Sequence, residues 1–393
     1  MTVEGDAGVA PPLVFRLFFW GSALVLVPFL FWNDWRQLQG LHLTEAHLLV
    51  GRDFLNVWTG GNLAIGRELG RLYDYQAYMG WQAGRFGPLD DLNYSYPPHS
   101  LFLATPFAAL PYGWALGAWT LFGLVFFCWA ARPYTSAGMS GFGAVLTPAA
   151  FANIWFGHYG FVIGGLWLLF FSSLERRPVR SGVLAALLTL KPHLGLLIAV
   201  VMVLRRQVLA IAVAIGVTLS LFLLSGLAFG FSLWHDWLFV TSRVQQAIMT
   251  APGPRFYFLM MPSAFIALHS LPEWTALLAQ AASAIGGAAL FWKGRGAVPR
   301  DLAFIAATAT ALISPYIFNY DLTVVSLGFV LCLYRSWPRL GEWEKRALWL
   351  AFAVPLFGIV FSLFPPMGLL SPVFLMAGLA VLVRHADYGV AAP

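Results

Sequence analysis

Long apolar runs separated by short polar stretches fill most of this chain. Runs near the ~20 residues that a membrane crossing needs lie at 12–32, 113–131, 208–230, 275–292, 320–335, 344–363 and 367–384. Shorter runs lie at 99–110, 141–155, 159–174, 181–190, 193–204, 258–270 and 301–315. Broken or re-entrant helices occur in membranes where protein buries them or where they line a wet cavity. The pattern predicts an all-α polytopic membrane protein with a polar site within the bilayer.

Composition supports this class. Hydrophobic residues make up 60% of the 393 residues and charged residues only 10%, against about 25% charged in soluble domains. We expect one integral membrane domain over residues 1–393, with about 10–12 transmembrane helices, some of them short or re-entrant.

The net charge of +6 does not indicate a nucleic-acid partner. The basic residues cluster between apolar runs, at 174–180, 204–207, 292–300 and 334–346. In membrane proteins such loops usually face the cytoplasm. We therefore expect membrane lipids around the protein, no nucleic acid, and a multi-pass location in the plasma (inner) membrane.

The segment 181–204 lies between two of these basic loops and contains "LKPH" at its centre. If both loops are cytoplasmic, the segment enters the membrane and returns, with Lys191, Pro192 and His193 at the turn. Proline removes a backbone donor and disfavours helix at the residue before it, which favours a break there. The alternative is a single kinked crossing with one basic loop outside.

Two longer polar segments are expected on the outer side. Residues 33–98 carry apolar residues at helical spacing among Gly, Arg and Asp, and end at the "YPP" break. This pattern predicts amphipathic helices that lie in the membrane interface. A second outer loop is expected at 231–257.

Lys191 is the one lysine of three that lies inside an apolar segment. A charge there costs roughly 3 kcal/mol or more, so the lysine needs an anionic partner. That partner is either a carboxylate of the protein or a phosphate or carboxylate of a ligand.

Asp53 follows the first apolar run by about twenty residues, next to Arg52. It is either a solvated loop residue or a general base, held at the bilayer edge where acceptor hydroxyls arrive from water.

Three further candidates lie at breaks between apolar runs. His158 in "FGHYG" could contact a phosphate, or could be a packed interfacial histidine. Asp321 could belong to a site, to the start of the next helix, where the dipole favours a carboxylate, or to both. Arg255 lies between prolines and aromatic residues and suits phosphate recognition, although surface anchoring is an equal alternative.

The chain contains no Walker loop, dinucleotide fingerprint, zinc motif or nucleophile elbow. A soluble nucleotide substrate therefore has no recognisable binding loop, whereas a lipid-linked donor needs none.

Four stretches in order resemble glycosyltransferase family 87, over roughly residues 12–335. They are "GRDFLNVWTGGNLAIGRELGRLYD", "YSYPPHSLFLATPFAALPYGWA", "GVLAALLTLKPHLGLLIAVVMVLRRQ" and "SPYIFNYDLTVV". The resemblance implies a GT-C fold and a sugar, mannose in this family, carried on a polyprenyl phosphate. We expect a glycolipid or glycan acceptor, with a protein as the open alternative.

The resemblance also assigns roles to residues. Asp53 matches the first-loop aspartate that acts as catalytic base, and Lys191 with Pro192 matches an element near the lipid phosphate. The chain departs from the family at His158, where relatives often have Gln, and in the late motif, where many members have His at the position of Tyr320 or Asp321.

The resulting hypothesis is an inverting membrane glycosyltransferase whose active site faces outward. Its catalytic residue is Asp53. The donor phosphate is bound by Lys191, Arg255 and His158, and the substrates by Arg52, His193, Tyr320 and Asp321. No metal and no other cofactor is expected. The alternative is a multispanning transporter or lipid flippase, in which the broken helices form a substrate path.

Overall fold

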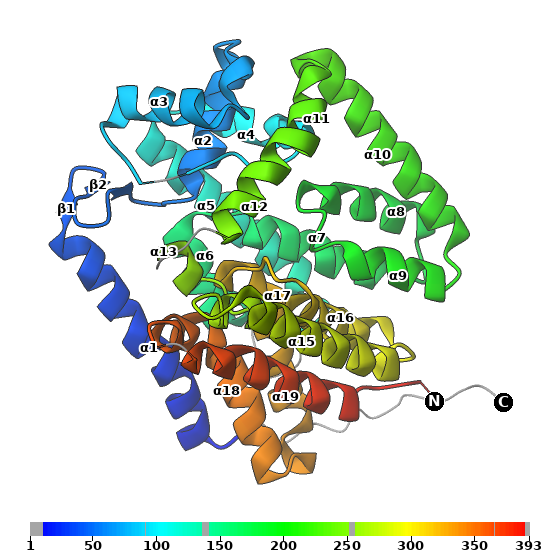
Figure 1. Cartoon of the computed structure of the whole chain (residues 1–393). Coiled ribbons are helices and arrows are strands. Elements are labelled where there is room, and N and C mark those ends of the chain that lie inside the picture. Colours follow the sequence, from blue (N-terminus) through cyan, green and yellow to red (C-terminus); the bar gives the residue numbers. More distant parts are fainter. Residues whose placement is uncertain (1–10, 91, 136–140, 251–255, 365, 390–393) are drawn as a thin grey trace.

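The computed structural model describes residues 11–90, 92–135, 141–250, 256–364 and 366–389, almost all of them in or between helices (Figure 1). The first half contains α1 (Leu13–Arg36), α2 (Phe54–Ile65), α3 (Tyr75–Phe86), α4 (Leu101–Ala108), α5 (Tyr112–Ala131), α6 (Pro148–Phe156), α7 (Gly160–Ser173), α8 (Pro178–Leu187), α9 (Leu196–Leu204) and α10 (Val208–Phe229). The second half contains α11 (Ser232–Asp236), α12 (Ser242–Thr250), α13 (Phe256–Leu259), α14 (Ala264–Ala267), α15 (Glu273–Gly294), α16 (Pro299–Ile313), α17 (Thr323–Ser336), α18 (Glu342–Ser362) and α19 (Leu370–Arg384). This is the all-α membrane protein that the apolar runs predict.

Five helices of the described chain are long and apolar enough to cross a membrane: α5, α10, α15, α18 and the Met367–Arg384 run that contains α19. The most apolar, α10, buries only Ala210, Ser225 and Gly226 among its 22 residues. An apolar helix with so little protein around it presents its surface to lipid. The total of 10–12 crossings stays a prediction.

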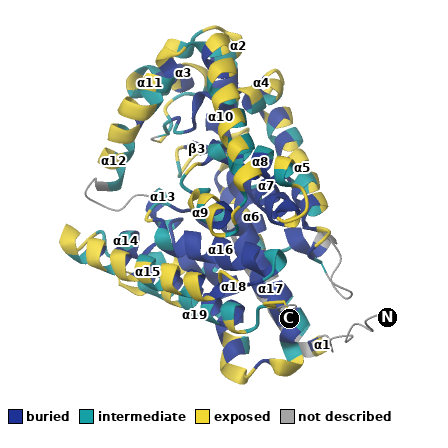
Figure 2. Ribbon diagram, turned by 90° about the vertical axis from the view of Figure 1, so that its right-hand side faces the viewer, coloured by how far each residue is buried: buried dark blue, intermediate teal, exposed yellow. Residues whose placement is uncertain are grey.

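The centre of the molecule is built from shorter helices that are buried on nearly every side (Figure 2). In α17 every residue except Arg335 is buried, and α16 buries 12 of its 15 residues. Helices that are apolar all round belong in a core. Here the longer helices, such as α10 and α15, surround that core and carry the exposed apolar surface.

The predicted hairpin at 181–204 is confirmed. Helix α8 is followed by the 3₁₀ turn η4 (Leu188–Leu190), and the helical segment ends at Lys191. Helix α9 then returns toward the start of α8. The two ends of the hairpin meet, because Arg205 Nη1 lies 3.4 Å from Glu175 Oε1. The single kinked crossing is therefore wrong: both flanking basic loops lie on one face.

The other basic loops gather at the same face. Arg205 Nη2 donates to the carbonyl of Arg295 at 3.1 Å, which joins the loops that follow α9 and α15. Arg335, at the end of α17, pairs with Asp301, at the start of α16, over 2.6 Å. We call this surface the basic face. The positive-inside rule predicts that such a face lies on the cytoplasmic side.

The 33–98 segment differs in part from its prediction. Residues 38–49 form a small antiparallel sheet of β1 (Leu38–Gln39), β2 (His42–Leu43) and β3 (Leu48–Leu49), with Leu38 opposite Leu43 and His42 opposite Leu49. Protein buries helix α2 on most of its sides. Gly61 allows this: a Cβ there would lie 2.8 Å from the carbonyl oxygen of Ala104, so α2 and α4 are in close backbone contact.

The second outer segment, 231–257, is largely helical over its described part. Helix α11, the π-helical turn η5 (Trp237–Thr241) and α12 follow one another. Trp237 in η5 donates from Nε1 to the carbonyl of Ser95 at 3.0 Å. This bond ties the second outer segment to the end of the first.

Gly160 determines how α7 packs against η6 (Asn319–Leu322). A Cβ at Gly160 would collide with the backbone oxygen of Tyr320 and lie 2.7 Å from Asn153 Oδ1. We expect Gly160→Ala to destabilise the fold by about 1–3 kcal/mol, measured as a lower melting temperature. The matched control is Gly216→Ala in α10, where a Cβ meets nothing within 4 Å. Equal melting temperatures for the two variants would show that Gly160 is not needed for the packing of α7 against η6.

Candidate active site

A cavity of about 360 Å³ lies at the end of the core helices opposite the basic face. We call it the central cavity. Its described lining is Asp53, Asn56, Tyr75, Leu92, Asn93, Ser95, Tyr96, Phe156, His158, Leu190, Lys191, Pro192, His193, Trp237, Gln245, Gln246, Ile248, Met249, Tyr257, Tyr316, Phe318 and Tyr320. These residues come from the two outer segments, the hairpin turn and the ends of core helices. Segments that are far apart in the sequence therefore line the same cavity.

Asp53 occupies the N-cap position of α2, yet its carboxylate does not cap the helix. Aspartate at this position usually accepts a bond from an amide of the first turn, as Asp74 does from the amide of Ala77 in α3. The Asp53 side chain lines the central cavity instead. Besides its hydrogen bond with Tyr320, the carboxylate can therefore accept a bond from a molecule in the cavity.

Burial dominates the electrostatics of Asp53. The pKa of its carboxyl is raised from 3.8 to about 6, mainly by the loss of water, and the negative charge of Asp321 acts in the same direction. A hydrogen bond with Tyr320 and the positive charges of Lys191 and Arg52 oppose this rise. A carboxylate with a pKa near 6 is ionised at neutral pH and is a stronger proton acceptor than an ordinary aspartate.

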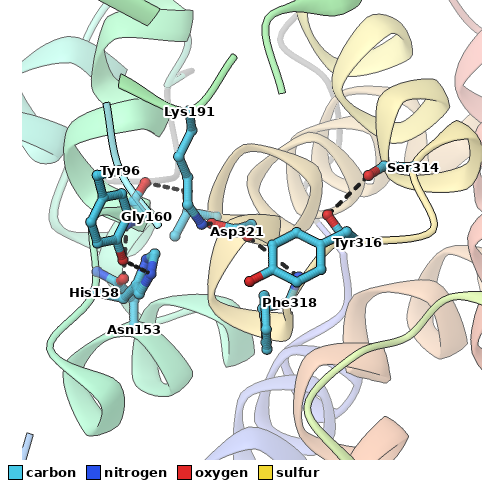
Figure 3. Close-up of polar contacts among 10 residues, drawn as sticks. Tyr96, Asn153, His158, Gly160, Lys191, Ser314, Tyr316, Phe318 and Asp321 are labelled. Carbon is cyan, nitrogen blue, oxygen red and sulfur yellow. Dashed lines mark hydrogen bonds and ion pairs between the residues drawn. The ribbon is translucent and has the colours of Figure 1, made fainter. Parts of the chain in front are cut away.

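Lys191 lies at the turn of the α8–α9 hairpin and forms an ion pair with Asp321 (Figure 3). Its Nζ lies 2.7 Å from Oδ1 and 2.9 Å from Oδ2. Asp321 has a fully buried side chain and also accepts from the backbone amide of Phe318 at 3.3 Å. The anionic partner that Lys191 requires is thus a carboxylate of the protein. Lys191 still lines the central cavity.

His158 lies in a cage of tyrosine side chains. Its Nε2 lies 2.5 Å from the hydroxyl of Tyr96, and its ring stacks on Tyr320 with the centroids 4.1 Å apart. Gly157, just before it, ends α6 with a left-handed backbone at φ 62°. This turn separates α6 from α7 and directs the histidine into the cavity wall.

The structure brings together most of the residues singled out from the sequence. Asp53, Lys191, His158, His193 and Tyr320 all line the central cavity. These five come from four separate parts of the chain, so the sequence alone could not place them around one space.

The other three singled-out residues are not in that lining. Asp321 lies behind it, paired with Lys191. Arg52 is bound to Asp34, with its side chain only 3% exposed, and is not among the described lining residues. Direct substrate contact by Arg52 has no support here, because a carboxylate of the protein already occupies its guanidinium. Arg255 lies outside the described residues.

Sequence reasoning missed the amide and aromatic part of the lining, which is Asn56, Asn93, Gln245, Gln246, Tyr75, Tyr96, Phe156, Trp237, Tyr257, Tyr316 and Phe318. One of these had a signal: Asn56 follows Asp53 by three residues, the spacing that places two side chains on one helix face. The glutamines of α12 had none, because nothing in the sequence places α12 over the hairpin turn.

Among the described residues no group of three or more His, Cys, Asp or Glu side chains is arranged to hold a metal ion. The expectation that the protein needs no metal stays a prediction.

Comparison with known proteins gives one result. The family model described as glycosyltransferase family 87 matches residues 94–315, more than half of the chain. The match contains His158, Lys191 and His193, whereas Asp53, Tyr320 and Asp321 lie outside it. No curated protein and no solved structure matches the chain.

Proposed function

Because the chain belongs to glycosyltransferase family 87, we propose that this membrane glycosyltransferase transfers mannose from a polyprenyl-phosphate donor to an acceptor hydroxyl, with inversion. The observation that carries the proposal is that Asp53 and Lys191 line one cavity. A carboxylate and an ammonium group in the same cavity are the pair that such a transfer needs. One receives the proton of the acceptor, and the other faces the leaving phosphate.

The reaction is a single displacement. Asp53 accepts the proton of the acceptor hydroxyl, and the oxygen attacks the anomeric carbon of the sugar. The bond from that carbon to the phosphate oxygen breaks, and the bonding electrons leave with the polyprenyl phosphate. One attack from the face opposite the leaving group inverts the anomeric centre. Base catalysis of this kind contributes typically 10²–10⁴-fold to a rate.

The leaving phosphate gains negative charge, so fixed positive charge near it lowers the barrier. Lys191 is the candidate, although Asp321 already balances part of its charge. The Nζ has three N–H groups, which leaves donor capacity for a phosphate oxygen next to the carboxylate. Arg255 stays a second candidate from the sequence.

The depth of the cavity supports a lipid-linked donor. Helix α7 runs from the cavity to the basic face in 14 residues, which span about 21 Å at 1.5 Å per residue. This is shorter than the ~30 Å hydrocarbon core of a bilayer. The cavity floor therefore lies at membrane depth, within reach of a phosphate on a polyprenyl chain.

The orientation follows from the same helices. They join the basic face to the cavity end, so a cytoplasmic basic face places the cavity toward the outer side. An outward-facing site in the plasma membrane would receive its donor from the lipid phase. The acceptor would then be a glycolipid or glycan on that side.

The rate of transfer should depend on pH through Asp53. Only the ionised carboxylate accepts a proton, and the pKa of Asp53 is about 6. We expect the initial rate to be half-maximal near pH 6 and to fall about tenfold for each further pH unit on the acid side. Melting temperatures over the same range would separate this loss from unfolding. A rate that stays constant down to pH 4.5 in folded protein would contradict it.

The direct test of the function uses purified protein in detergent. We would add polyprenyl-phosphate [14C]mannose and membranes from a strain that lacks this protein, and measure radiolabel in the glycolipid and glycan fractions. Transfer without any ion gradient supports the enzyme. Movement of the donor across liposome membranes without transfer would instead support the flippase.

A further inference from the structure

Arg52 is next to Asp53 in the chain but belongs to a separate buried group. Its Nη2 lies 2.6 Å from Asp34 Oδ1 and its Nη1 2.9 Å from Asp34 Oδ2. Trp155 donates from Nε1 to the same Oδ2 at 2.6 Å, and the guanidinium carbon lies 4.1 Å from the centre of the Trp155 ring. We call Asp34, Arg52 and Trp155 the arginine clamp. Two parallel bonds and a stacked ring fix the orientation of a guanidinium.

The clamp joins three elements behind one wall of the central cavity. Asp34 is in the last turns of α1, Arg52 precedes α2, and Trp155 is in α6. Phe156, the neighbour of Trp155, lines the cavity, and the Arg52 guanidinium also lies 5.5 Å from its ring. A shift of the clamp would therefore move the wall that carries Asp53.

The backbone at the clamp is strained. Gly51 has φ 81° and Arg52 has φ 35°, both in the left-handed region. A residue with a Cβ loses about 1–2 kcal/mol there, and such conformations persist only where the surroundings enforce them. The turn continues directly into α2, where the amide of Phe54 donates to the carbonyl of Gly51 at 2.7 Å. The direction of the Asp53 side chain depends on this turn.

A relaxed turn has a competing state. In the structure the amide of Asn56 donates to the backbone carbonyl of Asp53 at 3.1 Å. If Arg52 returned to an ordinary backbone conformation, Asp53 could take the usual N-cap role and accept from this amide with its side chain. That bond is worth about 1 kcal/mol, and in the structure it is not made. The carboxylate would then be turned away from the cavity, with one oxygen bound to a backbone amide.

We propose that Arg52 is a positioning residue, and that the arginine clamp holds the strained turn which keeps the Asp53 carboxylate in the central cavity. The inference rests on the proposed function, because it assigns no role to Arg52 apart from Asp53. It also explains why a buried arginine of the sequence motif is bound to a carboxylate of the protein.

The test compares kcat and donor KM for Asp34→Asn and Arg52→Lys with the wild type, in the transfer assay with polyprenyl-phosphate [14C]mannose. We expect kcat to fall at least about tenfold, since a misplacement near 1 Å can cost 10²-fold, while donor KM stays within about twofold. The matched control is Asp301→Asn, which breaks the Asp301–Arg335 pair of the same 2.6 Å length at the basic face. It should lower the melting temperature without lowering kcat.

Combination with Asp53→Asn separates positioning from general loss of structure. If Arg52 acts through Asp53, then Arg52→Lys lowers the residual rate of Asp53→Asn no further. A further loss of the same size as in the wild type would overturn the proposal. Trp155→Phe, which keeps the stacked ring but removes the N–H donor, is a milder variant for the case that Arg52→Lys does not fold, and should lower kcat to a smaller extent.

The two proposals fail in different ways. Wild-type activity in Asp53→Asn would overturn the role of Asp53 as the base, and with it the role of the clamp. An inactive Asp53→Asn together with folded, fully active Arg52→Lys and Trp155→Phe variants would overturn the clamp alone.

Discussion

Replacement of Asp53 by asparagine should lower the rate of sugar transfer at least about 100-fold. Asparagine has nearly the same shape and can still accept a bond from Tyr320, but it does not take up the proton of an acceptor hydroxyl. Affinity for the donor should stay near that of the wild type, because the phosphate is expected to contact Lys191. Radiolabel transfer measures the rate, and binding of the labelled donor measures the affinity.

The stability of the same variant provides its control. Burial raises the pKa of Asp53 from 3.8 to about 6, so the folded protein holds this proton more tightly than the unfolded chain does. The contribution of Asp53 to stability is therefore present at low pH and is lost as the pH rises toward 6 and above. At pH 7 we expect Asp53→Asn to melt at or above the wild-type temperature. An Asn variant that keeps more than a tenth of the wild-type rate would show that Asp53 is not the base.

Lys191→Met should abolish transfer and destabilise the protein. Removal of the lysine leaves the Asp321 carboxylate buried without its partner, which typically costs 3–5 kcal/mol. The double variant Lys191→Met/Asp321→Asn removes both charges, and replacement of a whole buried pair is often close to neutral. We therefore expect the double variant to recover most of the melting temperature.

Activity of the double variant decides between the two roles of Lys191. If the ammonium group stabilises the leaving phosphate, the double variant folds but stays at least about 100-fold less active. If Lys191 only neutralises Asp321, transfer returns together with stability. Recovery of both would thus remove Lys191 from the phosphate site and leave it as a structural partner of Asp321.

Part of the candidate site was visible in the sequence because the cost of a charge in a membrane is a local property. Lys191 stood out as a charge inside an apolar run, and Pro192 next to it predicted the break that the hairpin shows. Asp53 had a weaker signal. It lies in a polar segment where a solvated carboxylate is the ordinary case, and residues 94–315 of the family match do not contain it.

Other features required the fold. Asp321 is 130 residues from Lys191 in the chain, and no spacing rule pairs them. The packing of α2 on α4 was not visible in the sequence, because amphipathic periodicity does not show which helix its apolar and small residues meet. Arg52 was assigned to substrate from its place in a motif, whereas the structure gives it Asp34 as a partner.

The order of residue types was enough to predict the class of the protein, the basic loops, the break at Pro192 and the need of Lys191 for an anion. Each follows from the free energy of transferring side chains or backbone groups from water to lipid. This free energy depends on the residue type and on its close neighbours in the chain. The folded structure was needed to show which anion Lys191 meets, where Arg52 is bound and that Asp53 faces a cavity. Ion pairs and cavities form between segments that are distant in the chain, so their geometry exists only after the helices have packed.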